Sequence, residues 1–194
     1  MKAMNKYTIQ AARKEDAPVI AEVVLTAVGD EIRNSFAGTP DRLPLVTDVF
    51  TRLAESEESQ YSYTNTLVAL ANDGSVAGAI VSYDGARLHQ LREAFIRVAN
   101  EVLGMNLKAE DFEDETSPDE IYLDSLCVFP EHRGQRLAAE LIAAAIERHK
   151  DSGKPVGLLV DPDNPRARRL YDRLGFKEVG MRPFAGVMMH HLQM

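Results

Sequence analysis

The sequence predicts an α/β or α+β fold with a mixed sheet. Three observations support this class. Strand-like and helical patterns alternate along the chain, Asn72-Asp73-Gly74 joins two strand-like runs, and the apolar run at residues 156–160 is typical of a buried central strand. The chain of 194 residues is long enough to bury a core without crosslinks, and no repeat or low-complexity linker divides it. We therefore expect a single domain over residues 1–194.

The N-terminal part of the chain predicts a strand and two helices. Residues 7–12 alternate between polar and apolar side chains well enough for an edge or first strand. Asp16 can cap the helix that follows, whose first turn contains Pro18 and whose apolar residues recur at helical spacing as far as Ile32. A second helix, which Asp41 can cap, leads into a polar loop.

The next part predicts a hairpin and a third helix. Residues 65–71 and 75–83 have strand character on either side of Asn72-Asp73-Gly74, because Asp-Gly tolerates the positive φ of a tight turn. The apolar period becomes helical over residues 86–103, and Gly104 is a typical residue to end a helix.

An acidic segment follows this helix. Residues 110–120 contain seven carboxylates and no basic side chain. Such a segment is usually a solvated loop. The sharper alternative is an acidic rim that attracts a cationic substrate by electrostatic steering. The sequence leaves both interpretations open.

Residues 121–153 predict a strand, a turn at Pro130 and a long amphipathic helix that ends at Gly153. The helix presents five apolar side chains to a core, namely Leu137, Leu141, Ile142, Ala145 and Ile146. A helix start offers unpaired N–H groups and the positive end of the helix dipole. With Arg133 and Arg136 beside it, this start is a candidate site for a phosphate-bearing ligand. A solvated basic turn is the plain alternative.

The C-terminal part predicts three more strands and one helix. After the central strand at residues 156–160, an Asp/Pro/Asn-rich loop leads to a helix over residues 166–174, which Gly175 ends. Residues 176–181 and 187–193 are the last strand candidates.

Composition excludes several classes of function. The formal net charge of −8 argues against nucleic-acid binding, which relies on Lys and Arg to neutralise phosphates. Cys127 is the only cysteine, so no intrachain disulfide or thiolate metal cluster is expected. No apolar run has the length of a membrane span and residues 1–10 lack the apolar core of a signal peptide, so we expect a cytoplasmic protein. Motifs of zinc hydrolases, P-loop proteins and Rossmann folds are missing, and no metal is predicted.

Two motifs resemble those of one enzyme family. Residues 126–138, LCVFPEHRGQRLA, are similar to the acyl-CoA-binding motif [QR]-x-x-G-x-[GA] of the GCN5-related N-acetyltransferases, the GNAT superfamily. Arg133 takes the first place and Ala138 the last, whereas Arg136 stands where glycine is commonest. Residues 164–176, NPRARRLYDRLGF, are similar to the second family signature, N-x-x-A-x-x-[LF]-Y-x-x-x-G-F. The two motifs occur in the family's order and spacing.

The resemblance implies the fold in more detail. The family has a central mixed, mostly antiparallel sheet of about six to seven strands flanked by helices, and its fourth and fifth strands splay around the CoA site. Here those strands would be residues 121–129 and 156–161. The family often joins its third and fourth strands tightly, whereas this chain inserts a helix and the acidic segment at about residues 84–120.

The resemblance also implies where acetyl-CoA binds. Pantetheine would pair with the backbone of the fourth strand, and the pyrophosphate would lie on backbone N–H groups at the next helix start. The cofactor-binding residues carried over are Leu126, Cys127, Val128, Arg133, Gly134, Gln135, Arg136, Leu137, Ala138, Asn164, Ala167 and Tyr171. The arginine at position 136 could replace the usual glycine contact by pairing with a phosphate. A buried, inert Cys127 is favoured over a cysteine that accepts the acyl group.

Three side chains have both a structural and a functional interpretation. Asn164 is a good helix N-cap before Pro165, and the resemblance adds a contact with the cofactor arm. Tyr171 could be a core residue, and the resemblance makes it the general acid that protonates the departing thiolate. Asp124 is the candidate base nearest the predicted thioester, or else a structural hydrogen-bond acceptor; Glu120 and Tyr122 share its face by strand alternation.

The resemblance implies acetyl transfer from acetyl-CoA to a primary amine by direct attack in a ternary complex. A neutral amine is the nucleophile, and an N–H group near Val128 would polarise the thioester. A cationic acceptor would fit the acidic rim, and a homodimer is left open. The alternative is a non-catalytic acyl-CoA-binding or sensing module on the same fold.

Overall fold

The computed structural model describes residues 6–194 and contains one seven-stranded sheet. The strands are β1 (Tyr7–Ala11), β2 (Thr66–Ala71), β3 (Val76–Asp84), β4 (Ile121–Val128), β5 (Val156–Val160), β6 (Lys177–Phe184) and β7 (Val187–Gln193). Their order in the sheet is β1-β2-β3-β4-β5-β7-β6. Every neighbouring pair is antiparallel except β4 and β5, which are parallel. This mixed, mostly antiparallel sheet confirms the predicted fold class.

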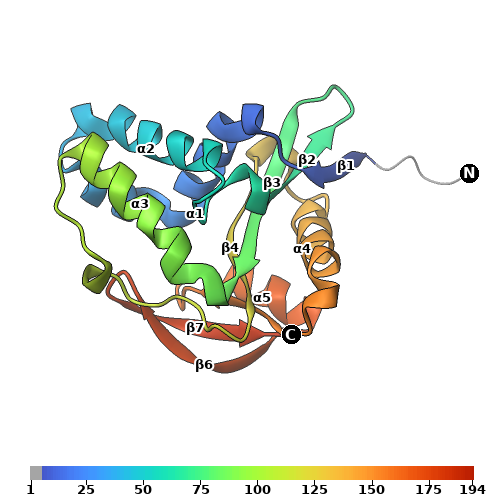
Figure 1. Cartoon of the computed structure of the whole chain (residues 1–194). Coiled ribbons are helices and arrows are strands. Elements are labelled where there is room, and N and C mark those ends of the chain that lie inside the picture. Colours follow the sequence, from blue (N-terminus) through green and yellow to red (C-terminus); the bar gives the residue numbers. More distant parts are fainter. Residues whose placement is uncertain (1–5) are drawn as a thin grey trace, which may run out of the picture.

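Five α-helices flank the sheet in the described part of the chain (Figure 1). They are α1 (Ala17–Ala37), α2 (Leu43–Glu55), α3 (Leu88–Leu103), α4 (Leu137–Arg148) and α5 (Pro165–Leu174). The buried side chains form two clusters. One cluster joins α1, α2 and α3 to one face of the sheet, and the other joins α4 and α5 to the opposite face. No helix within residues 6–194 is long and apolar enough to cross a membrane.

The helices differ from the sequence prediction in several details. Asp16 occupies the N-cap position of α1, but its side chain accepts the N–H of Arg13 and none of the helix. α4 ends at Arg148 rather than Gly153, because a separate 3₁₀ turn at Lys150–Ser152 follows it. A 3₁₀ turn that contains Asp41 precedes α2, so Asp41 is not its cap. α1 is interrupted at Gly29, whose φ of 84° and ψ of 165° are not helical. Short 3₁₀ turns and single glycine breaks leave the apolar period intact, which explains why periodicity overlooked them.

β4 and β5 separate soon after they begin. Their ladder consists of the pairs Ile121–Val156 and Tyr122–Gly157 and goes no further. Beyond these pairs, no strand within residues 6–194 pairs with the edge of β4 that faces β5. The expected splay between the fourth and fifth strands is therefore present, with its vertex at Tyr122 and Gly157.

A buried carboxylate holds the closed end of this splay. Glu120 accepts hydrogen bonds from Thr116, His191 and Gln193 at 2.7, 2.8 and 2.7 Å. Its carboxylate lies directly over Gly157, where an added Cβ would be 2.0 Å from Oε2 of Glu120. Burial raises the pKa of Glu120, but the hydrogen bonds outweigh burial and leave this pKa below its usual value. Glu120 thus ties the start of β4 to β5 and β7. The prediction that it shares a face with Asp124 as a further candidate base stays a prediction.

A β-bulge changes the facing of side chains within β4. Ile80 pairs with Leu126 and Ser82 with Leu123, so β4 uses three steps where β3 uses two. The extra residue lies at Asp124–Ser125. Leu126 therefore returns to the α4 side with Leu123, whereas strict alternation would have placed it beside Asp124. Because of the bulge, the side chains of Asp124 and Leu126 lie on opposite faces of the sheet.

The segment inserted between β3 and β4 is well packed. It comprises α3 and the acidic segment, and the ring of Phe95 in α3 lies 5.7 Å from that of Phe112 in a T-shaped contact. Asn100 exchanges hydrogen bonds with both backbone groups of Leu107, at 2.9 and 2.7 Å. These contacts hold the chain that follows α3 against that helix. The inserted segment therefore lies on the same side of the sheet as α1 and α2 (Figure 1).

Candidate active site

The turn between β4 and α4 presents a row of unpaired backbone donors. Gly134 has a φ of 75° and Arg136 a φ of 66°, and α4 starts directly after them. Within residues 6–194, the N–H groups of residues 134–138 donate to no acceptor in the chain. Gly134 leaves open space on its outer side, since an added Cβ would meet no atom within 4 Å. The arrangement suits a phosphate group, because it combines free N–H groups, a helix N-terminus and access without obstruction.

Arg136 occupies this turn in the conformation that glycine prefers. The left-handed backbone conformation costs a residue that has a Cβ about 1–2 kcal/mol. The side chain of Arg136 is exposed. At position 136, where the family motif usually has glycine, the backbone has a conformation that glycine adopts freely. Arginine adopts the same conformation with strain.

The backbone of β4 faces the splay at Leu126 and Val128. Phe129 donates its N–H to Ala77 of β3 at 3.0 Å, and successive residues of a strand direct their polar backbone groups to opposite edges. Val128, and Leu126 two residues earlier, therefore point theirs away from β3. The carbonyl of Val128 accepts from Nε of Arg133 at 2.9 Å. Cys127 is buried on the α1 side, and burial raises the pKa of its thiol, so it stays protonated at neutral pH.

α5 carries the second motif and packs on the same face of the sheet as the side chains of Leu126 and Val128. Asn164 accepts the N–H of Ala167 at 3.0 Å with its side chain, which confirms the predicted N-cap. Tyr171 contacts the buried Phe176, with 5.9 Å between ring centroids. Burial raises the pKa of Tyr171 to about 12, so the phenol is protonated over the physiological range. The side chains of Leu126, Val128, Ala167 and Tyr171 all pack against the core cluster beneath α4 and α5.

Asp124 lies two residues beyond Tyr122, the last residue of β4 that pairs with β5, and at the bulge. Its Oδ2 accepts from the hydroxyl of Tyr83 at 3.0 Å, and its Oδ1 from the hydroxyl of Ser125 at 2.7 Å. Burial, and then the charge of Glu115, raise the pKa of Asp124 to about 7. A half-buried carboxylate with a pKa of about 7 beside the vertex of the splay can accept a proton at physiological pH.

The comparisons with known proteins agree with this arrangement. The model of the acetyltransferase (GNAT) family matches residues 41–176, which include both motifs, the splay and α3. The chain belongs to the GNAT acetyltransferase family. The predicted family resemblance is therefore confirmed.

Solved structures show the same GNAT fold along nearly the whole chain. A structure described as an acetyltransferase is 31% identical, covers 96% of this chain and 97% of its own, and gives a TM-score of 0.75. An N-acetyltransferase from Staphylococcus aureus is 23% identical, with coverages of 96% and 100% and a TM-score of 0.77. A histone acetyltransferase HPA2-related protein from Corynebacterium glutamicum is 20% identical, with coverages of 97% and 96% and a TM-score of 0.68. No curated protein matches the chain.

Beside Asp124 lies a buried carboxylate that sequence reasoning missed. Glu115 is 4% exposed, and its Oε1 lies 3.4 Å from the hydroxyl of Tyr83 and 3.4 Å from Nε2 of Gln60. Its Oε2 forms an ion pair with Arg92 of α3. The acidic composition of residues 110–120 was the available signal, but nothing in it distinguished this carboxylate from six others.

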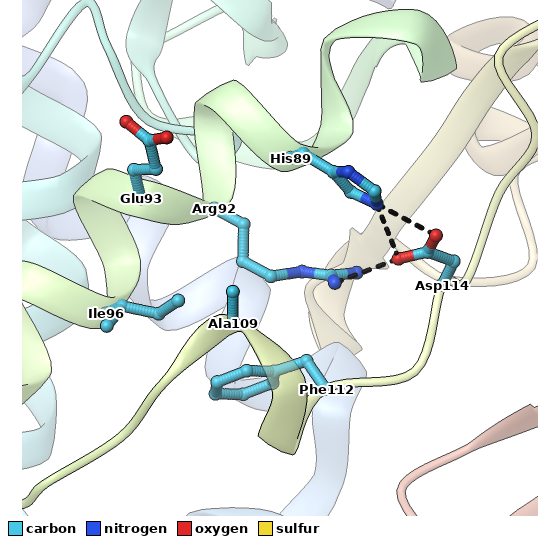
Figure 2. Close-up of a pocket in the computed structure, with 7 residues that line it drawn as sticks. All are labelled: His89, Arg92, Glu93, Ile96, Ala109, Phe112 and Asp114. Carbon is cyan, nitrogen blue, oxygen red and sulfur yellow. Dashed lines mark hydrogen bonds and ion pairs between the residues drawn. The ribbon is translucent and has the colours of Figure 1, made fainter.

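The acidic segment is only partly a solvated rim. Figure 2 shows Arg92 and His89 extending from α3 side by side to the carboxylate of Asp114. A pocket of about 430 Å³ lies there, lined by His89, Arg92, Glu93, Ile96, Ala109, Phe112 and Asp114. None of the residues carried over from the GNAT motifs lines it. Among the described residues, no cluster of His, Cys, Asp and Glu side chains could hold a metal ion.

Proposed function

We propose that this GNAT acetyltransferase moves an acetyl group from acetyl-CoA to a primary amine by direct attack in a ternary complex. The observation that carries the proposal is Asp124, a carboxylate with a pKa of about 7 beside the vertex of the β4–β5 splay. An alkylammonium of pKa ~10.4 must lose a proton before it can attack a thioester. Compared with an ordinary aspartate, the raised pKa makes that transfer easier by roughly 4 kcal/mol.

The residues of the two motifs fit acetyl-CoA in the proposed site. Free N–H groups at residues 134–138 suit the pyrophosphate, and the backbone edge of Leu126 and Val128 suits an extended pantetheine chain. Arg133 and Arg136 add positive charge at the turn. Bound there, acetyl-CoA would supply the activated acyl group, and the N–H of Val128 is the proposed donor to the thioester oxygen. Tyr171 is the proposed donor to the departing sulfur.

The acceptor is proposed to be an amine that carries positive charge. The chain has a net charge of −8, and the acidic segment adjoins the helices that cover the Asp124 face of the sheet. Such a field concentrates cations near the site. Because Arg92 already pairs with Asp114 and Glu115, the remaining carboxylates of the segment would contribute most to this attraction.

Release of free thiol from acetyl-CoA tests the proposed reaction. The purified protein is incubated with acetyl-CoA and a panel that contains a polyamine, an aminoglycoside, an uncharged alcohol and a peptide with a free N-terminus. We expect thiol release that depends on one or more of the amines and exceeds the rate without acceptor. Tight CoA binding by calorimetry without acceptor-dependent release from any amine would instead support the non-catalytic sensing module.

Substitution of Arg136 separates backbone strain from charge. Arg136→Gly is expected to increase the free energy of unfolding by about 1 kcal/mol, because glycine adopts positive φ without strain. It should also weaken CoA binding by about threefold to tenfold at low salt, because one phosphate partner is lost.

The matched control is Arg136→Ala, which removes the same charge but retains the Cβ. Its affinity for CoA should fall equally, while its stability in urea should not rise. Equal stability of the glycine and alanine variants would contradict backbone strain at Arg136. An unchanged affinity for CoA in both variants would contradict a contact between the Arg136 side chain and a phosphate.

A further inference from the structure

Two carboxylates share one phenol beside the proposed base. The hydroxyl of Tyr83 lies 3.0 Å from Oδ2 of Asp124 and 3.4 Å from Oε1 of Glu115. Tyr83 belongs to β3 and is 2% exposed, while Glu115 comes from the segment inserted before β4. One hydroxyl has one proton to donate, and the shorter contact assigns that hydrogen bond to Asp124. Glu115 is therefore close to Asp124 without neutralising it.

Arg92 fixes Glu115 in this place. The guanidinium pairs with the buried Glu115 on one side and, at 3.0 Å, with the more exposed Asp114 on the other, as Figure 2 shows for the outer pair. It also donates to the carbonyl of Glu113 at 2.9 Å. One positive charge is thus shared between two carboxylates, so Glu115 keeps part of its negative charge toward Asp124.

The other groups that face Asp124 are neutral. They come from the loop after α2, from β3 and from β4, and comprise Gln60, Tyr61, Tyr83, Tyr122 and Ser125. Burial raises the pKa of all three tyrosines well above the usual value, which keeps them protonated. The charged groups that act on this cluster in the described chain are Glu115, its partner Arg92 and Glu120, whose charge acts on Tyr122.

We propose that Glu115 is a positioning residue for the acyl transfer: held by Arg92, it places a negative charge beside Asp124 and makes that carboxylate a stronger base. The inserted segment between β3 and β4 is then part of the catalytic apparatus and more than a cover for α3. The inference rests on the proposed function, in which Asp124 accepts the proton of the amine. A purely structural Glu115 would hold the segment to α3 and leave the titration of Asp124 unchanged.

The test compares Glu115→Gln with Glu113→Gln in the full chain. Glu113 is exposed and its neighbour Arg92 contacts only its backbone carbonyl, so its substitution is the matched control. The titration of Asp124 is followed by ¹³C NMR of labelled aspartate carboxyls without acetyl-CoA, with the signal assigned by its loss in Asp124→Asn. We expect the midpoint to fall by about one pH unit in Glu115→Gln and to stay unchanged in Glu113→Gln.

The same variants are then assayed for acetyl transfer as a function of pH. The acidic limb of kcat/KM should move down with the NMR midpoint. Tyr83→Phe provides a second variant with the opposite sign, because loss of the hydrogen bond to Asp124 should raise its midpoint. If Glu115→Gln fails to fold, Arg92→Gln keeps the test decisive, because a Glu115 charge without its ion-pair partner should raise the Asp124 midpoint.

The outcomes distinguish the inference from the proposed function. An Asp124 midpoint that stays unchanged in folded Glu115→Gln, or in folded Arg92→Gln, overturns the inference and leaves the base role of Asp124 intact. A midpoint that does not rise in Tyr83→Phe contradicts the hydrogen bond from Tyr83 to Asp124. A midpoint that falls while the acidic limb of kcat/KM stays in place overturns the base role itself, and the inference with it.

Discussion

Replacement of Asp124 by asparagine is expected to lower kcat/KM for amine acetylation by about 10²–10⁴-fold, the range for loss of a general base. The acidic limb of the pH profile, which we expect near pH 7 in the unaltered enzyme, should disappear with it. Asparagine is isosteric and retains an oxygen that can accept from Tyr83, so the fold should be preserved.

The same substitution should stabilise the protein at alkaline pH. The pKa of Asp124 is about 7 in the folded protein and near 3.8 in the unfolded chain, so folding favours the protonated form. The resulting free-energy penalty is absent below about pH 4, grows as the pH rises from 4 to 7, and is complete above pH 7. Asparagine has no such penalty, and its advantage in unfolding free energy at pH 8 should be on the order of 2–4 kcal/mol.

Thermal unfolding at pH 4.5 and pH 8 measures this difference alongside the activity. Asp119→Asn is the control, because Asp119 is exposed in the same region. A variant at position 124 that keeps its activity and its acidic limb would assign the base elsewhere. A gain in stability that is equal at both pH values would contradict a pKa near 7.

Replacement of Tyr171 by phenylalanine is expected to lower kcat by about 10–100-fold while the affinity for CoA changes little. Its pKa of about 12 makes complete proton transfer to a thiolate of pKa ~8.5 uphill by roughly 5 kcal/mol. The phenol is therefore expected to stabilise the departing sulfur mainly by donating a hydrogen bond, which is worth about 1.5–3 kcal/mol when the acceptor is charged. The role of Tyr171 as general acid stays a prediction, and this hydrogen bond is the contribution that the substitution measures.

Tyr171→Phe should leave the stability nearly unchanged, since the hydroxyl of Tyr171 bonds no other group in residues 6–194 and the ring contact with Phe176 is retained. Tyr63→Phe is the control, because the hydroxyl of Tyr63 bonds Glu57 in an exposed loop. Steady-state rates and calorimetric CoA binding are measured for both. A full rate in Tyr171→Phe would return Tyr171 to a purely structural role.

Local signals predicted most of the elements and the proposed CoA-binding turn. Asn164 caps α5 as its residue type and the following proline indicated, and Gly175 ends that helix in the left-handed conformation. The unpaired donors before α4 follow from the start of any helix, so residues 133–138 were recognisable as a candidate anion site. Such features depend on residues within one or two helical turns of one another.

The surroundings of the Asp124 side chain could not be predicted from the local sequence, because they depend on how β4 pairs with β3. Alternation along β4 correctly grouped Asp124 with Tyr122, but the bulge at Asp124–Ser125 reversed the facing of Leu126. A bulge is defined by the register with β3, and the sequence of β4 alone does not record it. The same holds for Glu120, which accepts hydrogen bonds from β7.

By itself the sequence determined the order of strands and helices, the family, and the residues of the turn and of α5, because each follows from contacts close along the chain. The tertiary structure alone decided which carboxylate of the acidic segment reaches the base. Glu115 meets Arg92 across 23 positions and Tyr83 across 32, while Tyr83 meets Asp124 across 41. The pKa of Asp124 arises from this meeting, since burial and a neighbouring charge exist only once the distant elements have packed together.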